Sequence, residues 1–324
     1  MRGEGFIFNM TSLFHNSKIN KIRTAPFVNF IKLNKLTLRL LVFLVVLSLF
    51  QNIPAQDKPK ITADKVKLAA ILKKTREYCA KLEKAAFYYI CQEEVTEKIR
   101  TPQSIIRIPT NVNVEYLESS ARLEIRNGKT EVNTFLYEYQ LIRKEGQDEE
   151  TRILLKKDGK KKCRKNAKLE IQQFHYEKLI FGPSGLLSQY WQGYHDYEIV
   201  KEEILNGEKV IVIEAVPKAS LKENHAFGKI WVRESDFAIL KIEWDEKSLA
   251  SLQIIKERAE KNRAEPKITL ISEFGFEKNK IRFPSRFTFE EAYLNPKGEK
   301  FIRLEITVVY EDYKFFTVDV DVEY

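Results

Sequence analysis

The fold class is decided by the stretch GKIWVRESDFAILKIEW, residues 228–244. Two β-favouring runs, Lys229–Arg233 and Ala238–Trp244, flank the short polar segment Glu234–Asp236. Two runs of this kind on either side of a turn predict an antiparallel hairpin.

The same pattern recurs along most of the chain. The segment Phe316–Tyr324 alternates strictly between apolar and polar residues, which is typical of a strand with one packed and one wet face. Nothing resembles a β-α-β unit, so about ten antiparallel strands are expected. Further turns between strands are predicted at Asn127-Gly128, Asp158-Gly159, Asn206-Gly207 and Lys278-Asn279.

Helical spacing is found in three places. Apolar residues recur at helical intervals from Thr62 or Asp64, either of which can cap the helix, to about Lys84–Ala86. Two shorter segments, Gly182–Trp191 and Ser248–Arg263, also have helical character. We therefore expect a mainly β protein: a curved antiparallel sheet forming an incomplete barrel, with a long N-terminal helix and one or two short helices covering or plugging it.

An apolar block, Leu40–Phe50, has the character of a secretory signal peptide. Basic residues precede it, and Ile53-Pro54-Ala55-Gln56 follows it. The block is too short to cross a bilayer, which needs about 20 apolar residues. We expect cleavage near Ala55 or Gln56 and a soluble, exported protein of the periplasm or cell envelope.

The predicted organisation is a leader over residues 1–56 and one domain over residues 57–324. The leader is longer than a signal peptide needs, and the two methionines, Met1 and Met10, lie far upstream of the apolar block. A true start at another codon near Leu36 and a genuine N-terminal extension both remain open.

The formal charge of +9 overstates how basic the exported part is. Residues 1–56 hold seven basic residues and one acid, so they supply +6 and leave +3 for the rest. This balance is not that of a nucleic-acid binder, and it does not decide the oligomeric state. The basic cluster Lys156–Lys162 fits a solvated hairpin tip better than a contact with anionic lipid, which also remains open.

Three cysteines are present. In an oxidising compartment Cys79 and Cys91 are the natural disulfide pair, and Cys163 is left over. Because a continuous helix would hold Cys79 and Cys91 about 18 Å apart, the pairing requires the chain to reverse between them. No histidine lies at ligand spacing from these cysteines, so no metal site is predicted.

No catalytic constellation and no cofactor motif are found. His195-Asp196 could orient an imidazole, but a turn or hydrogen-bonding role is favoured because no nucleophile accompanies it. The adjacent acids Glu93-Glu94, Glu202-Glu203 and Glu290-Glu291 fall on opposite strand faces and cannot act as couples. The chain is therefore not expected to be an enzyme, and an unrecognised hydrolase remains the least favoured alternative.

The order of elements and the hairpin Gly228–Arg233 with Phe237–Ile242 resemble the lipoprotein-carrier superfamily, which includes periplasmic lipoprotein carriers and outer-membrane lipoprotein-sorting proteins. The resemblance implies an incomplete barrel with an apolar cavity for acyl chains. The sequence does not single out one arginine as the counterpart of the buried lid arginine of that family; Arg233, Arg282 and Arg286 are expected at the surface.

The ligand implied by the resemblance is a lipid or an acylated lipoprotein. The resemblance also leaves open a transient contact with a membrane surface. Aromatic residues on the strands can form either a filled core or the lining of a cavity, and the sequence does not separate the two. The function expected is therefore lipid binding for transport or sorting, with an envelope scaffold as the alternative. Candidate lining residues are Phe135, Tyr137, Phe287 and Phe289, and candidate lid residues are Leu186, Leu187, Tyr190 and Trp191.

Overall fold

The computed structural model describes residues 6–9, 63–107, 122–218, 225–250 and 253–316. Residues 1–14 and 68–324 belong to one compact unit, and residues 15–67 to a second, of which only the first turn of helix α2 is described. In chain order the elements are β1 (Phe6–Asn9), α2 (Ala63–Ala85), β2 (Tyr89–Arg107), β3 (Arg122–Lys144), β4 (Gln147–Lys157), β5 (Lys160–Arg164), β6 (Phe174–Glu177), η2 (Leu179–Phe181), α4 (Gly182–Leu187), η3 (Trp191–Gly193), β7 (His195–Leu205), β8 (Glu208–Pro217), β9 (Gly228–Arg233), β10 (Ile239–Trp244), α5 (Glu246–Ala250), α6 (Gln253–Asn262), β11 (Glu265–Glu273), β12 (Phe276–Lys278), β13 (Ile281–Phe283), β14 (Arg286–Leu294) and β15 (Lys300–Phe315).

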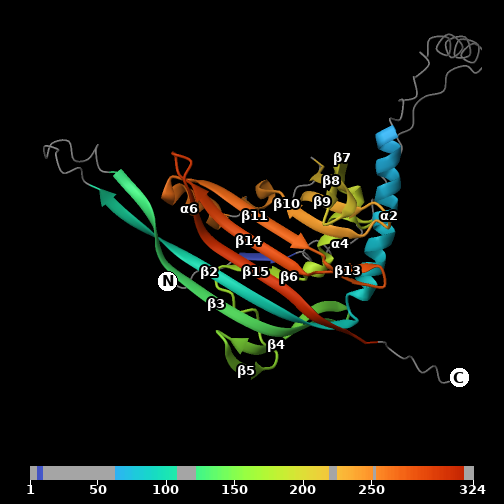
Figure 1. The fold of residues 1–324 in the computed structure, drawn as a ribbon, viewed down its shortest axis with the longest axis horizontal. Helices are drawn as coiled ribbons and strands as arrows, with labels where there is room; N and C mark the ends of the chain where they lie inside the picture. Colours follow the sequence, from blue (N-terminus) through green and yellow to red (C-terminus); the bar gives the residue numbers. More distant parts are fainter. Residues whose placement is uncertain (1–5, 10–62, 108–121, 219–224, 251–252, 317–324) are drawn as a thin grey trace, which may run out of the picture. The chain divides into compact units, whose positions relative to one another are not determined.

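Eleven strands form one open antiparallel sheet in the order β5-β4-β3-β2-β15-β14-β11-β10-β9-β8-β7 (Figure 1). Most neighbouring strands follow one another in the chain, as in hairpins. In the middle of the sheet, however, β2, the first of these strands in the chain, pairs with β15, the last. Strands β5 and β7 are the two edges. The predicted mainly β fold with an unclosed antiparallel sheet and a few helices is confirmed.

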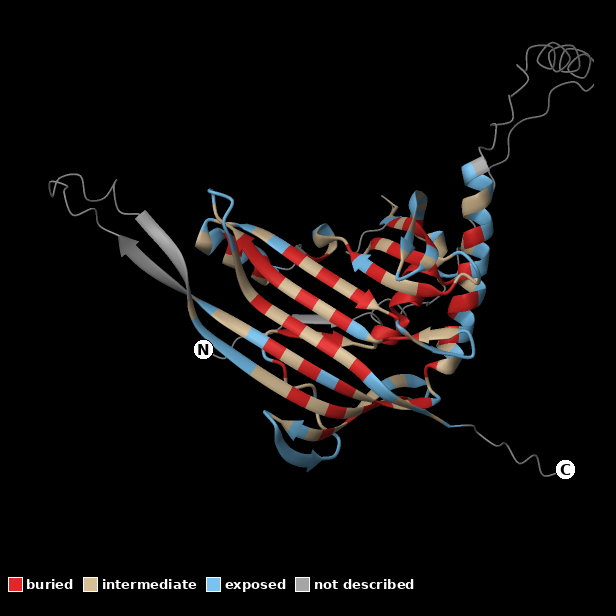
Figure 2. Ribbon diagram, viewed as in Figure 1, coloured by how far each residue is buried: buried red, intermediate tan, exposed pale blue. Residues whose placement is uncertain are grey.

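Burial alternates along the central strands, as Figure 2 shows. In β15 the residues from Leu304 to Tyr310 alternate between buried and half-buried. The face of the sheet on which β6 and α4 lie, here called the inner face, carries the main core. Strand β8 is buried on both faces, because Val210 and Val212 form a second, small cluster with Trp231 on the opposite side.

Helices α2 and α4 lie together against the inner face. Helix α4 is completely buried and begins with a proline in its first turn, where a missing amide costs nothing. The side-chain amide of Gln192 donates to the carbonyl oxygens of Leu72 in α2 and Leu187 in α4, at 2.7 and 2.8 Å. The predicted helices are thus present, the last of them divided into α5 and α6.

One predicted turn is wrong. Asn127-Gly128 does not reverse the chain but lies inside the 23-residue strand β3. Opposite it, the pairing with β2 shifts register between Arg100 and Pro102. A bulge accommodates both the proline, which cannot donate to the ladder, and the permissive Asn-Gly pair.

The predicted disulfide is not formed, and all three cysteines are free. The chain does reverse between Cys79 in α2 and Cys91 in β2, but the two thiols have different surroundings. The Cys79 thiol contacts Ser184 of α4, whereas the Cys91 thiol contacts Tyr313 of β15. Burial raises the pKa of both thiols well above its ordinary value.

The signal-peptide block and residues 317–324 of the last predicted strand lie outside the described residues. Within the described part, no helix is both long and apolar enough to span a membrane.

Candidate functional site

A short segment crosses the inner face between β5 and helix η2. It comprises Glu170–Lys178, includes β6, and is here called the strap. It is not part of the large sheet; β6 pairs only with β1, in parallel, among the described strands. Its side chains alternate, so that Phe174 and Tyr176 are buried while His175 and Glu177 are half-buried.

The two buried rings of the strap fill the centre of the inner face. Phe174 stacks on Phe289 with ring centroids 4.1 Å apart and planes 7° apart, and lies 6.3 Å from Phe287. Tyr176 packs against Phe287 at 5.2 Å. Stacked aromatic pairs of this kind contribute about 0.5–1.5 kcal/mol beyond the burial of their area. The apolar surface of β14 is therefore covered by the strap's own side chains.

A buried carboxylate holds the middle of the strap. Glu93 of β2 is fully buried and accepts hydrogen bonds from Nε and Nη2 of Arg152, at 2.6 and 3.2 Å. It also accepts from the hydroxyl groups of Tyr176 and Tyr310, at 3.1 and 2.9 Å. Burial alone would lower the pKa of Arg152, but the carboxylates of Glu150 and Glu93 outweigh it and keep that pKa well above its ordinary value.

The carboxyl end of the strap is tied to β4. The backbone amide of Lys178 donates to Glu150 at 2.5 Å, and the same carboxylate accepts from Tyr139 at 2.9 Å and from Arg152 at 3.0 Å. Glu150 and Glu93 thus share one arginine and together satisfy all three of its nitrogen atoms. A buried pair of this kind is costly to break, because the group left behind stays charged and unpaired.

The amino end of the strap is tied to β2 and β3. The amides of Gln172 and Gln173 donate to Glu97, at 2.9 and 3.2 Å, and the amide of Glu170 donates to the Tyr137 hydroxyl. Burial raises the pKa of Glu97, although these hydrogen bonds oppose the shift.

The Gln173 side chain joins the strap to a second buried carboxylate. Its Oε1 accepts from Arg303 of β15 at 2.6 Å and from Arg258 of α6 at 3.3 Å. Both arginines also donate to Glu291, which is fully buried and accepts from Tyr293 as well. Burial, its largest influence, lowers the pKa of Arg303. The strap is therefore held along its whole length by polar contacts with β2, β3, β4, β15 and α6.

The candidate lining residues are buried in two places. Phe287 and Phe289 lie directly under the strap, whereas Phe135 and Tyr137 stack on each other at 6.1 Å on β3. Tyr137 also reaches the strap through its hydroxyl group. The structure thus brings all four to the inner face, in a packed core.

The candidate lid residues lie elsewhere, beside α2. Leu186, Leu187 and Trp191 are buried, whereas Tyr190 is 51% exposed and packs edge-on against the Trp191 ring. Helix α4 is therefore part of the core rather than a surface flap, and the segment that covers the aromatic inner face is the strap. A lid role for these four residues stays a prediction.

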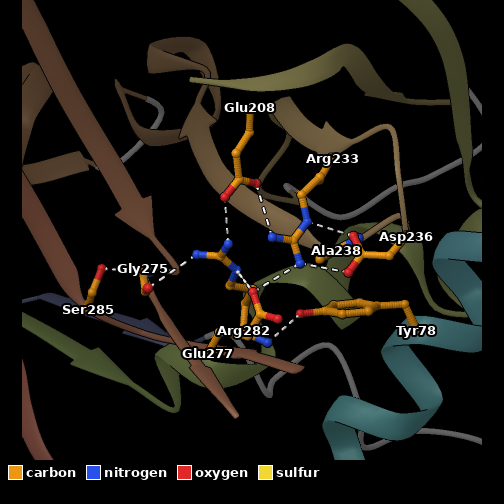
Figure 3. Close-up of polar contacts among 9 residues, drawn as sticks. All are labelled: Tyr78, Glu208, Arg233, Asp236, Ala238, Gly275, Glu277, Arg282 and Ser285. Carbon is orange, nitrogen blue, oxygen red and sulfur yellow. Dashed lines mark hydrogen bonds and ion pairs between the residues drawn. The ribbon is translucent and has the colours of Figure 1, made fainter. Parts of the chain in front are cut away.

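Two arginines expected at the surface are largely buried, and Figure 3 shows the ion pairs that they form. Arg233 and Arg282 are 14% and 13% exposed, and each forms ion pairs with Glu208 and Glu277. The backbone amide of Arg282 donates to the Tyr78 hydroxyl at 2.9 Å, which ties α2 to β13. Arg286 is 51% exposed, as expected. The sequence could not reveal this network, because its members lie on β8 and β9 and on β12 and β13, two pairs of strands that are distant in the chain.

The polar side chains of the inner face hold the strap in place through hydrogen bonds and ion pairs. In each adjacent acid pair of the inner face, Glu93-Glu94 and Glu290-Glu291, one acid is buried and its neighbour is more exposed, as strand geometry predicts. His195 is buried, its Nδ1 lies 3.0 Å from the Trp191 carbonyl oxygen, and burial lowers its pKa. Among the described residues, no group of three or more histidine, cysteine or acidic side chains could hold a metal ion.

The strap and its buried partners were not found from the sequence. Their one available signal is the alternation in Phe174-His175-Tyr176, which is too short to distinguish from an ordinary strand. The sequence placed the acids of Glu93-Glu94 and Glu290-Glu291 on opposite strand faces, but it could not show that Arg152 is the buried partner of Glu93.

Comparison with known proteins adds likenesses of fold. Neither a protein-family model nor a curated protein matches the sequence. A DUF1329 family protein from Desulfovibrio piger is 11% identical, with 78% of this chain and 95% of that chain covered and a TM-score of 0.35. A LolA superfamily protein from Nitrosomonas europaea is 12% identical, with 77% and 94% covered and a TM-score of 0.30. An outer membrane lipoprotein-sorting protein domain from Vibrio parahaemolyticus is 12% identical, with 78% and 95% covered and a TM-score of 0.31.

Proposed function

We propose that this protein binds an acyl chain of a lipid or lipoprotein on the inner face, in the place that the strap rings occupy. The observation that carries the proposal is the stacking of Phe174 on Phe287 and Phe289. A segment outside the main sheet covers an aromatic surface and is held there by side-chain hydrogen bonds. Moving it exposes apolar surface without unpairing any strand of the large sheet.

Binding is driven by burial of the ligand. Each methylene group that leaves water for the inner face contributes about 0.8 kcal/mol. Against this gain stand the contacts that the strap loses, so only a long apolar chain displaces it. The protein is then a carrier with its site closed at rest, in the cell envelope if the predicted leader directs export.

The experiment is a comparison of two neighbouring glutamines. Gln173→Ala removes the acceptor shared by Arg258 and Arg303, whereas Gln172→Ala changes an exposed residue whose side-chain amide donates to Glu131. Binding is measured by fluorescence titration with BODIPY-labelled palmitate. Because affinity is reduced by the fraction of molecules that are closed, loosening the strap should strengthen binding several-fold in the first variant alone.

Loss of the acceptor for two half-buried arginine donors should also lower the stability of Gln173→Ala by about 1–3 kcal/mol, measured by urea unfolding. Equal affinities in the two variants and the unchanged protein would contradict the claim that the ligand displaces the strap. No saturable binding in any of the three would rule out the carrier function.

A second function is favoured by the packing itself. The inner-face rings fill the space between the sheet and the strap, as expected of an envelope scaffold with a filled core. Absence of binding in all three proteins would favour this alternative.

A further inference from the structure

We propose that the ligand of the inner face is an anionic amphiphile, and that Arg258 and Arg303 bind its carboxylate or phosphate group in the place of the Gln173 side chain. This inference rests on the proposed function, because Gln173 leaves the two arginines only when the strap is displaced. It adds to that function the chemical class of the ligand and the direction in which the ligand lies.

The two arginines share one neutral acceptor. Nη2 of Arg303 and Nη2 of Arg258 both donate to Oε1 of Gln173, at 2.6 and 3.3 Å. Their Nη1 atoms both donate to the carboxylate of Glu291, at 3.0 Å. Arginine binds carboxylate and phosphate groups through two parallel hydrogen bonds, so an anionic group is a better acceptor at this position than the amide oxygen of the strap.

Arg258, Arg303 and Glu291, here called the two-arginine cluster, carry an excess positive charge. In the described part of the chain, Glu291 is the one carboxylate that forms an ion pair with either arginine. Burial lowers the pKa of Arg303; Glu291 opposes this shift, and Arg258 adds to it. Arg152 differs, because two carboxylates surround that single arginine and raise its pKa in spite of burial. The two-arginine cluster therefore lacks one anion.

Local structure directs both arginines to this place. The pairing of β14 with β15 shifts register between Glu291 and Ala292, and Arg303 is the extra residue of the resulting bulge. Because the next residue of β15 is buried in the core, regular alternation would direct Arg303 to the opposite face, and the bulge re-aims it. Arg258 lies three residues after the buried Ile255, on the same side of α6.

The cluster lies at one end of a row of buried residues on β14. Three residues at alternate positions share one face of this strand: Phe287, Phe289 and Glu291. The strap covers the row in chain order, because Gln173 shares its arginine donors with Glu291 and the next two buried strap residues pack on the two phenylalanines. An amphiphile with its anionic group at the arginines and its acyl chain along the phenylalanines would take the place of all three strap side chains.

Charge also indicates the direction of the ligand. Toward the other end of the strap, Tyr176 contacts Glu93, and Glu93 and Glu150 together exceed the charge of Arg152 by one negative charge. An anionic group is repelled there and attracted by the two-arginine cluster. The arginines of the cluster are half-buried, so the head group would lie at the border with solvent while the chain is buried.

The test is displacement of BODIPY-labelled palmitate by three unlabelled ligands with chains of the same length: palmitate, hexadecyl phosphate and palmitamide. Palmitamide keeps the oxygen acceptor but carries no charge. We expect at least one of the two anions to displace the label tenfold better than palmitamide, and the better of the two identifies the head group as carboxylate or phosphate. Equal displacement by all three overturns this inference and leaves acyl binding intact, whereas failure of the labelled palmitate to bind overturns both.

Arginine variants locate the preference. Arg258→Gln and Arg303→Gln should each reduce the preference for the anion several-fold, whereas Arg286→Gln, which removes an exposed arginine of β14, should leave it unchanged. Because a ratio of two affinities is compared within each variant, a looser strap alone does not change the result. A preference that persists unaltered in both Arg258→Gln and Arg303→Gln overturns the inference.

A third measurement needs no ligand. Gln173→Glu places a carboxylate between the two arginines, so we expect a higher midpoint of urea unfolding than in the unchanged protein. Gln172→Glu adds the same charge beside Glu131 and should lower the midpoint. Because the strap is then held closed, Gln173→Glu should also bind labelled palmitate several-fold more weakly. A midpoint of Gln173→Glu no higher than that of the unchanged protein shows that the cluster does not accept a second anion, and overturns the inference.

Discussion

At the scale of single residues, Glu93 and Arg152 form a buried ion pair in the core of this fold. Both are buried, and their contact joins β2 to β4 while the strap hydroxyl of Tyr176 completes it. Arg152→Met leaves a carboxylate without its cation, so we expect a loss of about 3–5 kcal/mol in the free energy of unfolding, measured in urea. Glu93→Gln should also destabilise, by less, because Glu150 still pairs with Arg152.

The double variant separates pairing from packing. With both charges removed, no buried Glu93 carboxylate remains unpaired, so Arg152→Met with Glu93→Gln should cost clearly less than the sum of the single changes. Strict additivity would mean that the two side chains stabilise the fold independently, contrary to the contacts described.

Because Glu97 is buried, we expect the free energy of unfolding to depend on pH through this residue. Burial raises its pKa above the ordinary value of 4.5, so the folded protein binds this proton more readily than the unfolded chain. Stability from this group is therefore present below about pH 4.5 and declines as pH rises through the raised pKa. We expect the difference in unfolding free energy between the unchanged protein and Glu97→Gln to shift against the unchanged protein over this range. A difference independent of pH from 4 to 7, in urea titrations at each pH, would show that the Glu97 pKa is not raised.

At the scale of elements, α2 and β2 place two thiols in separate contacts. Because Cys79 and Cys91 are buried with raised pKa values, iodoacetamide should modify only Cys163 in the folded protein and all three cysteines in urea. Mass spectrometry counts the added groups. Modification of Cys163 alone in urea without reductant would instead reveal the Cys79–Cys91 disulfide.

Elements with strong local patterns were predictable from the sequence. Helix α2 has apolar residues at helical spacing over 23 residues, and the hairpin of β9 and β10 has two alternating runs around a polar turn. The uninterrupted course of β3 through Asn127-Gly128 was not predictable, because a turn dipeptide also fits a bulge when Pro102 lies opposite. The strap was missed because what defines it is contact with carboxylates distant in the chain rather than its own pattern.

At the scale of the whole sheet, the sequence predicted an open antiparallel arrangement but not its order. Joining β2 to β15 brings the two ends of the domain together at its centre, and no local signal encodes a pairing across 200 residues of chain. That pairing places Glu93 beside Tyr310 and β14 beneath the strap. The candidate site therefore follows from topology, and its aromatic lining was the only part that the sequence could suggest.

The central claim is that an acyl chain takes the place of the strap rings. Photo-crosslinking with a diazirine-bearing fatty acid, followed by peptide mass spectrometry, tests it most directly. We predict labels on β14 at Phe287 and Phe289 and on the strap, with loss of labelling when unlabelled fatty acid competes. Labels confined to the opposite face near Trp231, or spread evenly without competition, would contradict the account.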